Sequence, residues 1–282
     1  MFLGLETKQM KTLKTGGVSK TVEKASELYR APALEKGLDI IELLSTSEKG
    51  LSQGEIAKAL SRSSNEIYRM LTTLVRRGYI SRSNEDDRYI LSLRLFSLSQ
   101  RYPPVSRLIN FSLPLMQKVT KEVWQSCHLV MENNGDVVVV SSVDSPGYWG
   151  LGIRVGSVMG LWNTGSGRVL TAFRSESEVK EIIDRHTLVI GEPAIDLNIF
   201  YEELDLIRRQ GFDIRPSNTA SGVTNMSFPI FDNQNRAVAA VTCPYIQRID
   251  TLDVPSIEKC KEVYNDLTTT LTRYFCGDCP EA

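Results

Sequence analysis

Two helix-start signals stand eleven residues apart in the first third of this chain. Ser52 is followed three positions later by Glu55, and Ser63 is followed by Glu66. In each pair the hydroxyl and the carboxylate can satisfy backbone N–H groups that the first turn of a helix leaves free. Apolar residues at helical spacing follow each pair. Two capped helices so close together predict a helix-turn-helix.

The flanking sequence completes a small domain around this unit. An amphipathic helix is expected from about Ala33 to Leu44. Two short β-rich runs, Tyr79 to Arg82 and Arg88 to Leu91, flank the polar turn sequence SNEDD, which is typical of a β-hairpin. The sequence therefore predicts a winged helix-turn-helix over residues 31–92. Residues 1–30 are polar and weakly periodic, so we expect them to form an extension.

Local charge favours a nucleic-acid partner, although the 282-residue chain has a net charge of only −1. Between residues 52 and 82, six cationic side chains stand against two carboxylates, a local net charge of +4. Such a surface attracts phosphates. A solvated helical face explains the charge equally well by itself, and the two capped helices and the charged wing favour DNA.

In a helix-turn-helix, the second helix enters the major groove with its first turns near the bases. Asn65 is suited to pair with adenine, and Arg69 with guanine or a phosphate. For Tyr68 and Arg69, a structural role or a contact with the DNA backbone is as well supported as base recognition. Glu66 is expected to cap the helix. Two wing arginines, Arg82 and Arg88, are suited to phosphates or the minor groove. The full set of candidate DNA contacts is Arg62, Ser64, Asn65, Tyr68, Arg69, Arg76, Arg82 and Arg88.

The remainder of the chain reads as an α+β domain on a mostly antiparallel sheet, over residues 112–282, after a linker helix over residues 93–111. Two pairs of β-rich runs, CHLVME with VVVVSSV and VTNMSFPIF with AVAAVTC, flank turn-forming residues and predict two hairpins. Helices are expected at Leu113 to Trp124, Ser166 to Phe173, Glu176 to Arg185, Ile199 to Gln210 and Ile257 to Phe275.

Composition excludes several protein classes. No stretch reaches the roughly 18 apolar residues of a membrane span, and the N-terminus lacks the apolar core of a signal peptide, so a cytoplasmic protein is expected. Five scattered cysteines do not form a disulfide framework. Cys276 and Cys279 form a CxxC pair at the C-terminus, for which two surface thiols are favoured over a metal or redox site. No cofactor is expected.

The run LSQGEIAKALSRSSNEIYRMLTTLVRRGYI, followed by RYILSLRLFSLSQ, resembles the DNA-binding domain of the IclR family of bacterial regulators. The family usually carries Ser-Thr where this chain has Asn65-Glu66, so the resemblance implies DNA binding without specifying the operator. The matching residues are Glu55, Ile56, Ala57, Tyr68, Arg69, Leu71, Leu74, Gly78, Tyr79, Arg88, Tyr89 and Leu91.

The resemblance continues more loosely to about residue 274, through Val155-Gly156, Thr164 to Arg168, Arg208 to Phe212, Gly222 and Pro229-Ile230. It implies a GAF-like domain that binds a small effector and joins copies of the chain into a homodimer or homotetramer. The ligand site that it implies, together with the glycine-rich turn, comprises Gly165, Ser166, Gly167, Arg215, Asn225 and Thr242.

The glycine-rich turn has a physical interpretation of its own. Its backbone N–H groups open a helix, where the helix dipole favours an anion. The alternative is a close approach between helix and sheet that glycine permits. The family often carries an acid at Arg215 and a cysteine at Asn225, and these substitutions indicate an anionic ligand such as a carboxylate. Arg215 is expected to be the only charged member of the site, unless it points to solvent from a loop after Gly211.

Two other function classes remain open. In an enzyme fused to a DNA-binding domain, Cys127, Cys243 and Cys260 are candidate nucleophiles, and His128 and His186 are the only histidines. Neither histidine lies in a nucleophile or metal motif, so a non-catalytic protein is expected, with His128 packed in the core. The second domain could also serve only to dimerise. The favoured function is a sequence-specific transcriptional regulator whose operator binding is altered by a small metabolite.

Overall fold

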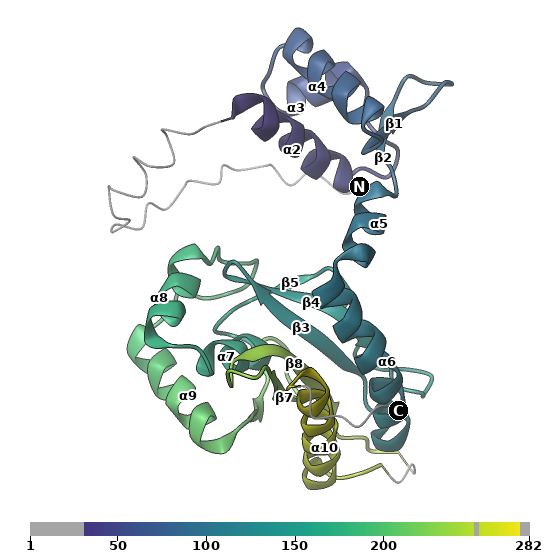
Figure 1. The fold of residues 1–282 in the computed structure, drawn as a ribbon. Coiled ribbons are helices and arrows are strands. Elements are labelled where there is room, and N and C mark those ends of the chain that lie inside the picture. The colour runs from purple at the N-terminus through teal and green to yellow at the C-terminus, as the bar shows by residue number, and fades with distance from the viewer. Residues whose placement is uncertain (1–30, 251–253, 277–282) are drawn as a thin grey trace, which may run out of the picture. The chain divides into compact units, whose positions relative to one another are not determined.

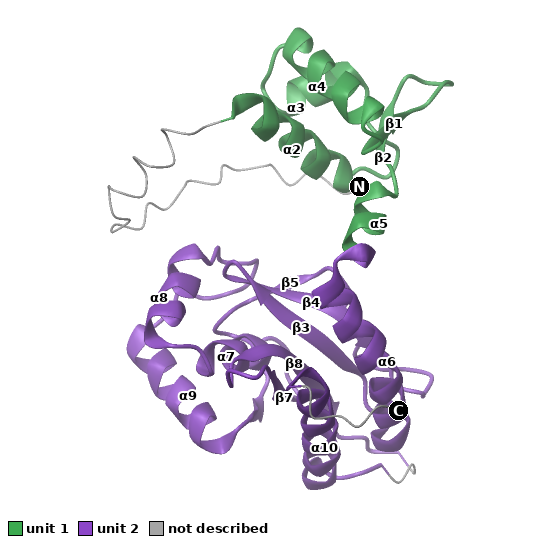
Figure 2. Cartoon of the chain, in the orientation of Figure 1, with its two compact units in different colours: residues 1–99 green, residues 100–282 purple. Residues whose placement is uncertain are grey.

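The computed structural model describes residues 31–250 and 254–276, so the predicted extension at residues 1–30 lies outside the described residues. The described chain divides into two compact units at residues 99 and 100 (Figure 2). The predicted domain boundaries at residues 93 and 112 fall close to this division and stay predictions.

The first unit is a helix-turn-helix with a small antiparallel wing (Figure 1). Both predicted capping boxes are confirmed, because Ser52 and Ser63 each cap a helix together with Glu55 and Glu66. Gly78 follows the second of these helices with a φ of 75°, a conformation that favours glycine. The elements are α2 (Pro32–Ser45), α3 (Gln53–Ala59), α4 (Ser64–Arg76), β1 (Ile80–Arg82), β2 (Tyr89–Leu91) and α5 (Arg94–Arg101).

One apolar cluster holds α2, α3, α4 and the wing strands together. Ile40 from α2, Ile56 from α3 and Ile67 from α4 are completely buried and meet in this core. Burial of an aliphatic side chain of this size contributes roughly 1.5–3 kcal/mol. The core therefore fixes which face of α4 remains exposed.

The predicted linker helix is two helices. α5 ends at Arg101, and α6 (Pro103–Val123) begins directly after Tyr102. Proline suits the first helical position because the backbone N–H that it lacks has no partner there. The prediction that the next helix starts at Leu113 is therefore wrong, since Pro103 and Pro104 start a helix that continues without a break to Val123.

The second unit is built on one antiparallel sheet with the strand order β5-β4-β3-β8-β7-β6. Both predicted hairpins are confirmed, and Asn134 and Gly135 make a two-residue turn with positive φ angles of 57° and 92°. The strands are β3 (Cys127–Asn133), β4 (Asp136–Val143), β5 (Val158–Met159), β6 (Asp213–Pro216), β7 (Val223–Phe231) and β8 (Ala237–Ile246).

Helices cover both faces of this sheet (Figure 1). α6 and α10 (Ile257–Cys276) pack on one face, and α7 (Gly165–Ala172) packs on the other, with α8 (Glu176–Arg185) and α9 (Leu197–Gln210) beside it. Alternate residues of the longer strands therefore enter different cores. Among the described residues, no helix is long and apolar enough to cross a membrane.

Candidate functional site

The first candidate surface is the exposed face of α4. Ile67 and Leu71 point into the core, which leaves Asn65, Tyr68 and Arg69 exposed at helical spacing. Tyr68 keeps 53% of its surface exposed. An amide, a phenol and a guanidinium are thus presented together on one face.

Ser63 and Lys36 hold the carboxylate of Glu66 in place at the start of α4. It accepts hydrogen bonds from the backbone N–H and hydroxyl of Ser63, and its Oε1 lies 2.5 Å from Nζ of Lys36. The hydrogen bond from Lys36, followed by those from Ser63, lowers the pKa of Glu66 to about 2. The charge of Glu66 is therefore balanced from within the unit and does not oppose an incoming phosphate.

The wing arginines have carboxylate partners. Nη2 of Arg82 lies 3.0 Å from Asp87, and the guanidinium of Arg88 donates to both oxygens of Glu55 at 3.0 and 3.3 Å. Arg88 also donates to the carbonyl of Gly50 at 2.9 Å. Arg88 thus joins the wing to the start of α3. Contact of Arg82 and Arg88 with DNA stays a prediction, and their ion pairs leave α4 as the more available cationic surface.

The second candidate site surrounds the first turn of α7. Ser166 and Thr242 are buried, and their hydroxyls lie 2.9 Å apart. Thr242 also lies 2.8 Å from the hydroxyl of Ser227 on β7. A side chain at Gly167 would lie 2.0 Å from the carbonyl oxygen of Leu161. Gly167 therefore permits a close approach of α7 to the preceding loop. A side chain at Gly165 would lie 2.5 Å from the hydroxyl of Ser227, so this glycine permits the close approach to the sheet that the alternative interpretation expects.

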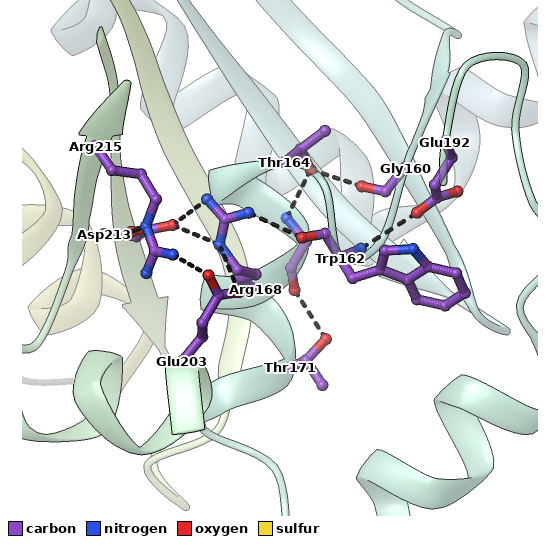
Figure 3. A network of polar contacts seen from close by, with 10 residues as sticks. Gly160, Trp162, Thr164, Arg168, Thr171, Glu192, Glu203, Asp213 and Arg215 are labelled. Atoms are coloured by element: carbon purple, nitrogen blue, oxygen red, sulfur yellow. Dashed lines mark hydrogen bonds and ion pairs between the residues drawn. The ribbon is translucent and has the colours of Figure 1, made fainter. Parts of the chain in front are cut away.

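Four charged side chains form a cluster beside this turn (Figure 3). Asp213 joins two arginines, with Oδ2 at 2.9 and 2.7 Å from Nε and Nη2 of Arg168, and Oδ1 at 2.5 Å from Nε of Arg215. Glu203 on α9 accepts a hydrogen bond from Nη1 of Arg215 and lies 3.9 Å from Nε of Arg168. Arg168 also donates to the carbonyl of Trp162 at 2.8 Å.

The cluster corrects two expectations about Arg215. It is not the only charged residue at the site, and it does not point to solvent from a loop. Arg215 lies on strand β6 directly opposite Asn225 of β7, and both residues are half-buried. The pairing of the short edge strand β6 with β7 places it there, which the local sequence does not indicate.

His128 is a further buried polar residue on this side of the sheet. It pairs in register with Thr242, and its strand neighbours Cys127 and Leu129 enter the opposite core. The imidazole is buried, as predicted, but Nε2 has no hydrogen-bond partner among the described residues. Desolvation lowers the pKa of His128 to about 4, so the imidazole is neutral at pH 7.

A groove of about 220 Å³ opens next to the start of α7. Trp162, Ile199 and Phe200 supply apolar surface, and Asn163 and Glu203 supply polar groups. Glu203 therefore belongs both to the groove wall and to the charged cluster. Oδ1 of Asn163 is buried without a hydrogen-bond partner among the described residues.

Comparison with known proteins identifies the family. Residues 33–83 match the family profile described as IclR helix-turn-helix domain, and residues 102–257 match the one described as Bacterial transcriptional regulator IclR C-terminal. This chain belongs to the IclR family. It is a DNA-binding transcriptional regulator with a C-terminal ligand-binding domain.

Individual IclR-family relatives are distant. The HTH-type transcriptional regulator KdgR of Dickeya chrysanthemi is 25% identical over 206 residues, which cover 70% of this chain and just under two thirds, 66%, of the relative. The glycerol operon regulatory protein of Streptomyces griseus is 28% identical over 211 residues, with coverages of 74% and 82%. An IclR homolog of Microbacterium hydrocarbonoxydans, complexed with 4-hydroxybenzoate, has a TM-score of 0.70 at 19% identity, covering 86% of this chain and 99% of the homolog.

The buried thiols of this IclR-family chain do not suit nucleophilic chemistry. Desolvation raises the pKa of Cys127 to about 12 and that of Cys260 to about 11, and it also raises the pKa of Cys243. The reactive thiolate is therefore suppressed at all three positions. The described residues contain no group of three or more side chains able to hold a metal ion. Cys276 ends α10, and Cys279 lies outside the described residues.

Sequence reasoning missed Arg168, Asp213 and Glu203 as members of the IclR ligand-domain site. Asp213 left no local signal, because the four residues of β6 form a strand only through their pairing with β7. Arg168 follows the helix cap Thr164 by one turn, which places it at the same end of α7. Glu203 left no local signal, since only the packing of α9 brings it to the cluster.

Proposed function

We propose that this IclR-family regulator reads its operator through the exposed face of α4 and that a small carboxylate bound beside α7 alters this binding. The exposed trio Asn65, Tyr68 and Arg69 on a capped helix is the observation that carries the DNA half of the proposal. These groups can read base edges, whereas the ion-paired wing arginines are less free to do so.

Within this interface the residues have different roles. Asn65 pairs with an adenine edge, and Arg69 with guanine or a phosphate. Tyr68 packs against a base or the sugar-phosphate backbone. Arg62 and Arg76, both exposed near the ends of α4, contact phosphates, and the hydroxyl of Ser64 lies at the first turn where a phosphate would approach. The wing arginines Arg82 and Arg88 contribute mainly by holding the wing in place.

The ligand half of the proposal rests on the cationic groups beside α7. Arg168 and Arg215 are the two cations of the charged cluster. Glu203 pairs with Arg215 and also lines the groove, so it lies between the groove and Arg215. The turn Gly165–Gly167 and the hydroxyl of Thr242 lie beside the cluster, and Asn225 is opposite Arg215 on the neighbouring strand. The Microbacterium homolog binds 4-hydroxybenzoate, itself a carboxylate, which agrees with this ligand class.

We also propose that the regulator acts as a homodimer or homotetramer on DNA in the cytoplasm. A two-fold dimer reads two half-sites of matching symmetry. Leu93, just before α5, exposes 81% of its surface, and Phe96 exposes 64%. Large apolar side chains exposed so close together are suited to burial against a second copy of the chain.

Selection of duplexes from a random-sequence library by the full chain tests the function. Fluorescence anisotropy of the selected duplex then measures affinity with and without a panel of small carboxylates and their amides. The proposal expects a shared sequence motif among selected duplexes and a carboxylate that changes the affinity while its amide does not. Binding without any sequence preference would contradict operator recognition.

A further inference from the structure

The two carboxylates of the charged cluster are not equivalent. The side chain of Asp213 is 2% exposed and contacts both arginines, so it is buried and has no path to solvent. Glu203 is 28% exposed, is carried by α9, and lines the groove beside α7. Of the two, only Glu203 can leave the cluster by a simple rotation of its side chain toward the groove.

The charges of the cluster make this difference important. Arg168 and Arg215 are two cations, and Asp213 balances only one of them. Without Glu203 the cluster would carry one uncompensated positive charge next to a groove. An uncompensated, partly buried guanidinium is unfavourable, so the site requires a carboxylate at the position of Glu203.

The geometry points to Glu203 as an internal carboxylate that holds the place of the ligand. We infer that a small monocarboxylate enters the groove, takes the place of Glu203 on Arg215, and releases Glu203 toward solvent. This inference rests on the proposed ligand class. The exchange keeps the number of charges constant, because one carboxylate arrives as another leaves, and Trp162 and Phe200 can contact the apolar part of the ligand.

An internal competitor also determines selectivity. Glu203 is tethered next to Arg215, so its effective concentration is high and a ligand must bind with enough additional contact to displace it. A neutral amide offers no charge to replace the carboxylate and leaves Glu203 in place. The site therefore favours acids over their amides, and it responds only to acids whose body also fills the groove.

The exchange is tested by chemical complementation of Glu203→Ala in the full chain. All three tryptophans, Trp124, Trp149 and Trp162, belong to the second unit, so tryptophan fluorescence follows its unfolding. We expect Glu203→Ala to unfold at a lower temperature than the wild type. Acetate should then raise the Tm of the variant by about 3–6 °C at roughly ten times its Kd, relative to chloride at equal ionic strength. Acetamide should not raise it.

Two proteins serve as controls. The wild type retains its internal carboxylate, and Glu202→Ala removes an exposed carboxylate one position away on α9. Neither should respond to acetate more than to chloride. If Glu203→Ala does not fold, Glu203→Gln keeps the shape of the side chain without its charge, and the same acetate response is expected.

An equal response of Glu203→Ala to acetate and acetamide would overturn the inference. So would an acetate response that persists in Glu203→Ala/Arg215→Met, because the exchanged carboxylate is assigned to Arg215. Binding of the selected duplex is measured on the same proteins. Failure of the acetate response with intact duplex binding refutes the exchange alone, whereas failure of the wild type to select DNA refutes the proposed function.

Discussion

Arg168 and Asp213 form an ion pair in which both side chains are buried. Nε of Arg168 donates to Oδ2 of Asp213 at 2.9 Å, and Nη2 lies 2.7 Å from the same oxygen. The pair connects the first turn of α7 to the edge strand β6, which are far apart in the sequence. Removal of one partner from such a pair leaves a charge in the interior without its counterion.

We therefore expect Arg168→Met to destabilise the second unit by about 3 kcal/mol. Asp213 would keep Arg215 as a partner but lose the two contacts from Arg168. Urea unfolding monitored by tryptophan fluorescence measures the change. Arg185→Ala is the matched control, because Arg185 forms an exposed ion pair with Glu181 and should cost less than about 0.5 kcal/mol. Equal costs for the two variants would contradict a structural role for the buried pair.

The neutral imidazole of His128 makes stability depend on pH. The pKa of His128 is lowered from 6.5 to about 4 by burial, so between these values the unfolded chain binds a proton that the folded chain does not. Stability is complete above pH 6.5 and falls as the pH decreases toward 4, by as much as about 3 kcal/mol from this residue. Urea unfolding at several pH values should therefore show a smaller decrease for His128→Phe than for the wild type.

Other titrating groups are common to both proteins in that experiment, so the difference between the two curves isolates His128. His186, the other histidine, is retained in both. Parallel curves from pH 7 to pH 4 would show that folding leaves the pKa of His128 unchanged, which would contradict the effect of its burial.

The exposed apolar residues around α5 predict the oligomeric state. Leu93→Ser/Phe96→Ser should shift the protein from a dimer or tetramer to a monomer at micromolar concentration, because both side chains are largely exposed in a single copy. Sedimentation equilibrium measures this shift. A wild-type protein that is already a monomer would exclude the oligomer. A double variant that keeps the oligomer mass of the wild type would place the interface elsewhere.

The elements that could be predicted from the sequence are those with a local cause. The capping residues Ser52 and Ser63 fix two helix starts, and Asn134-Gly135 fixes a hairpin turn, because each interaction spans only a few residues. Family resemblance added Ser166 and Thr242, which do meet in the structure, at 2.9 Å.

The parts that could not be predicted depend on distant pairing. β5 and β6 have two and four residues, too few to show alternation, and they exist as strands because β4 and β7 pair with them. The charged cluster combines α7, α9 and β6, so neither the neutralisation of Arg215 nor the participation of Glu203 could be seen in the local sequence.

The measurement that most directly tests the central claim is the affinity of Arg69→Ala for the selected duplex over a range of salt concentrations. If Arg69 reads a base, the variant should bind about 1–3 kcal/mol more weakly, with relaxed sequence preference; a phosphate contact should give a smaller loss and a shallower salt dependence. Arg185→Ala, in the second unit, should bind like the wild type. Wild-type affinity and salt dependence for Arg69→Ala would contradict the proposal that the exposed face of α4 binds the operator.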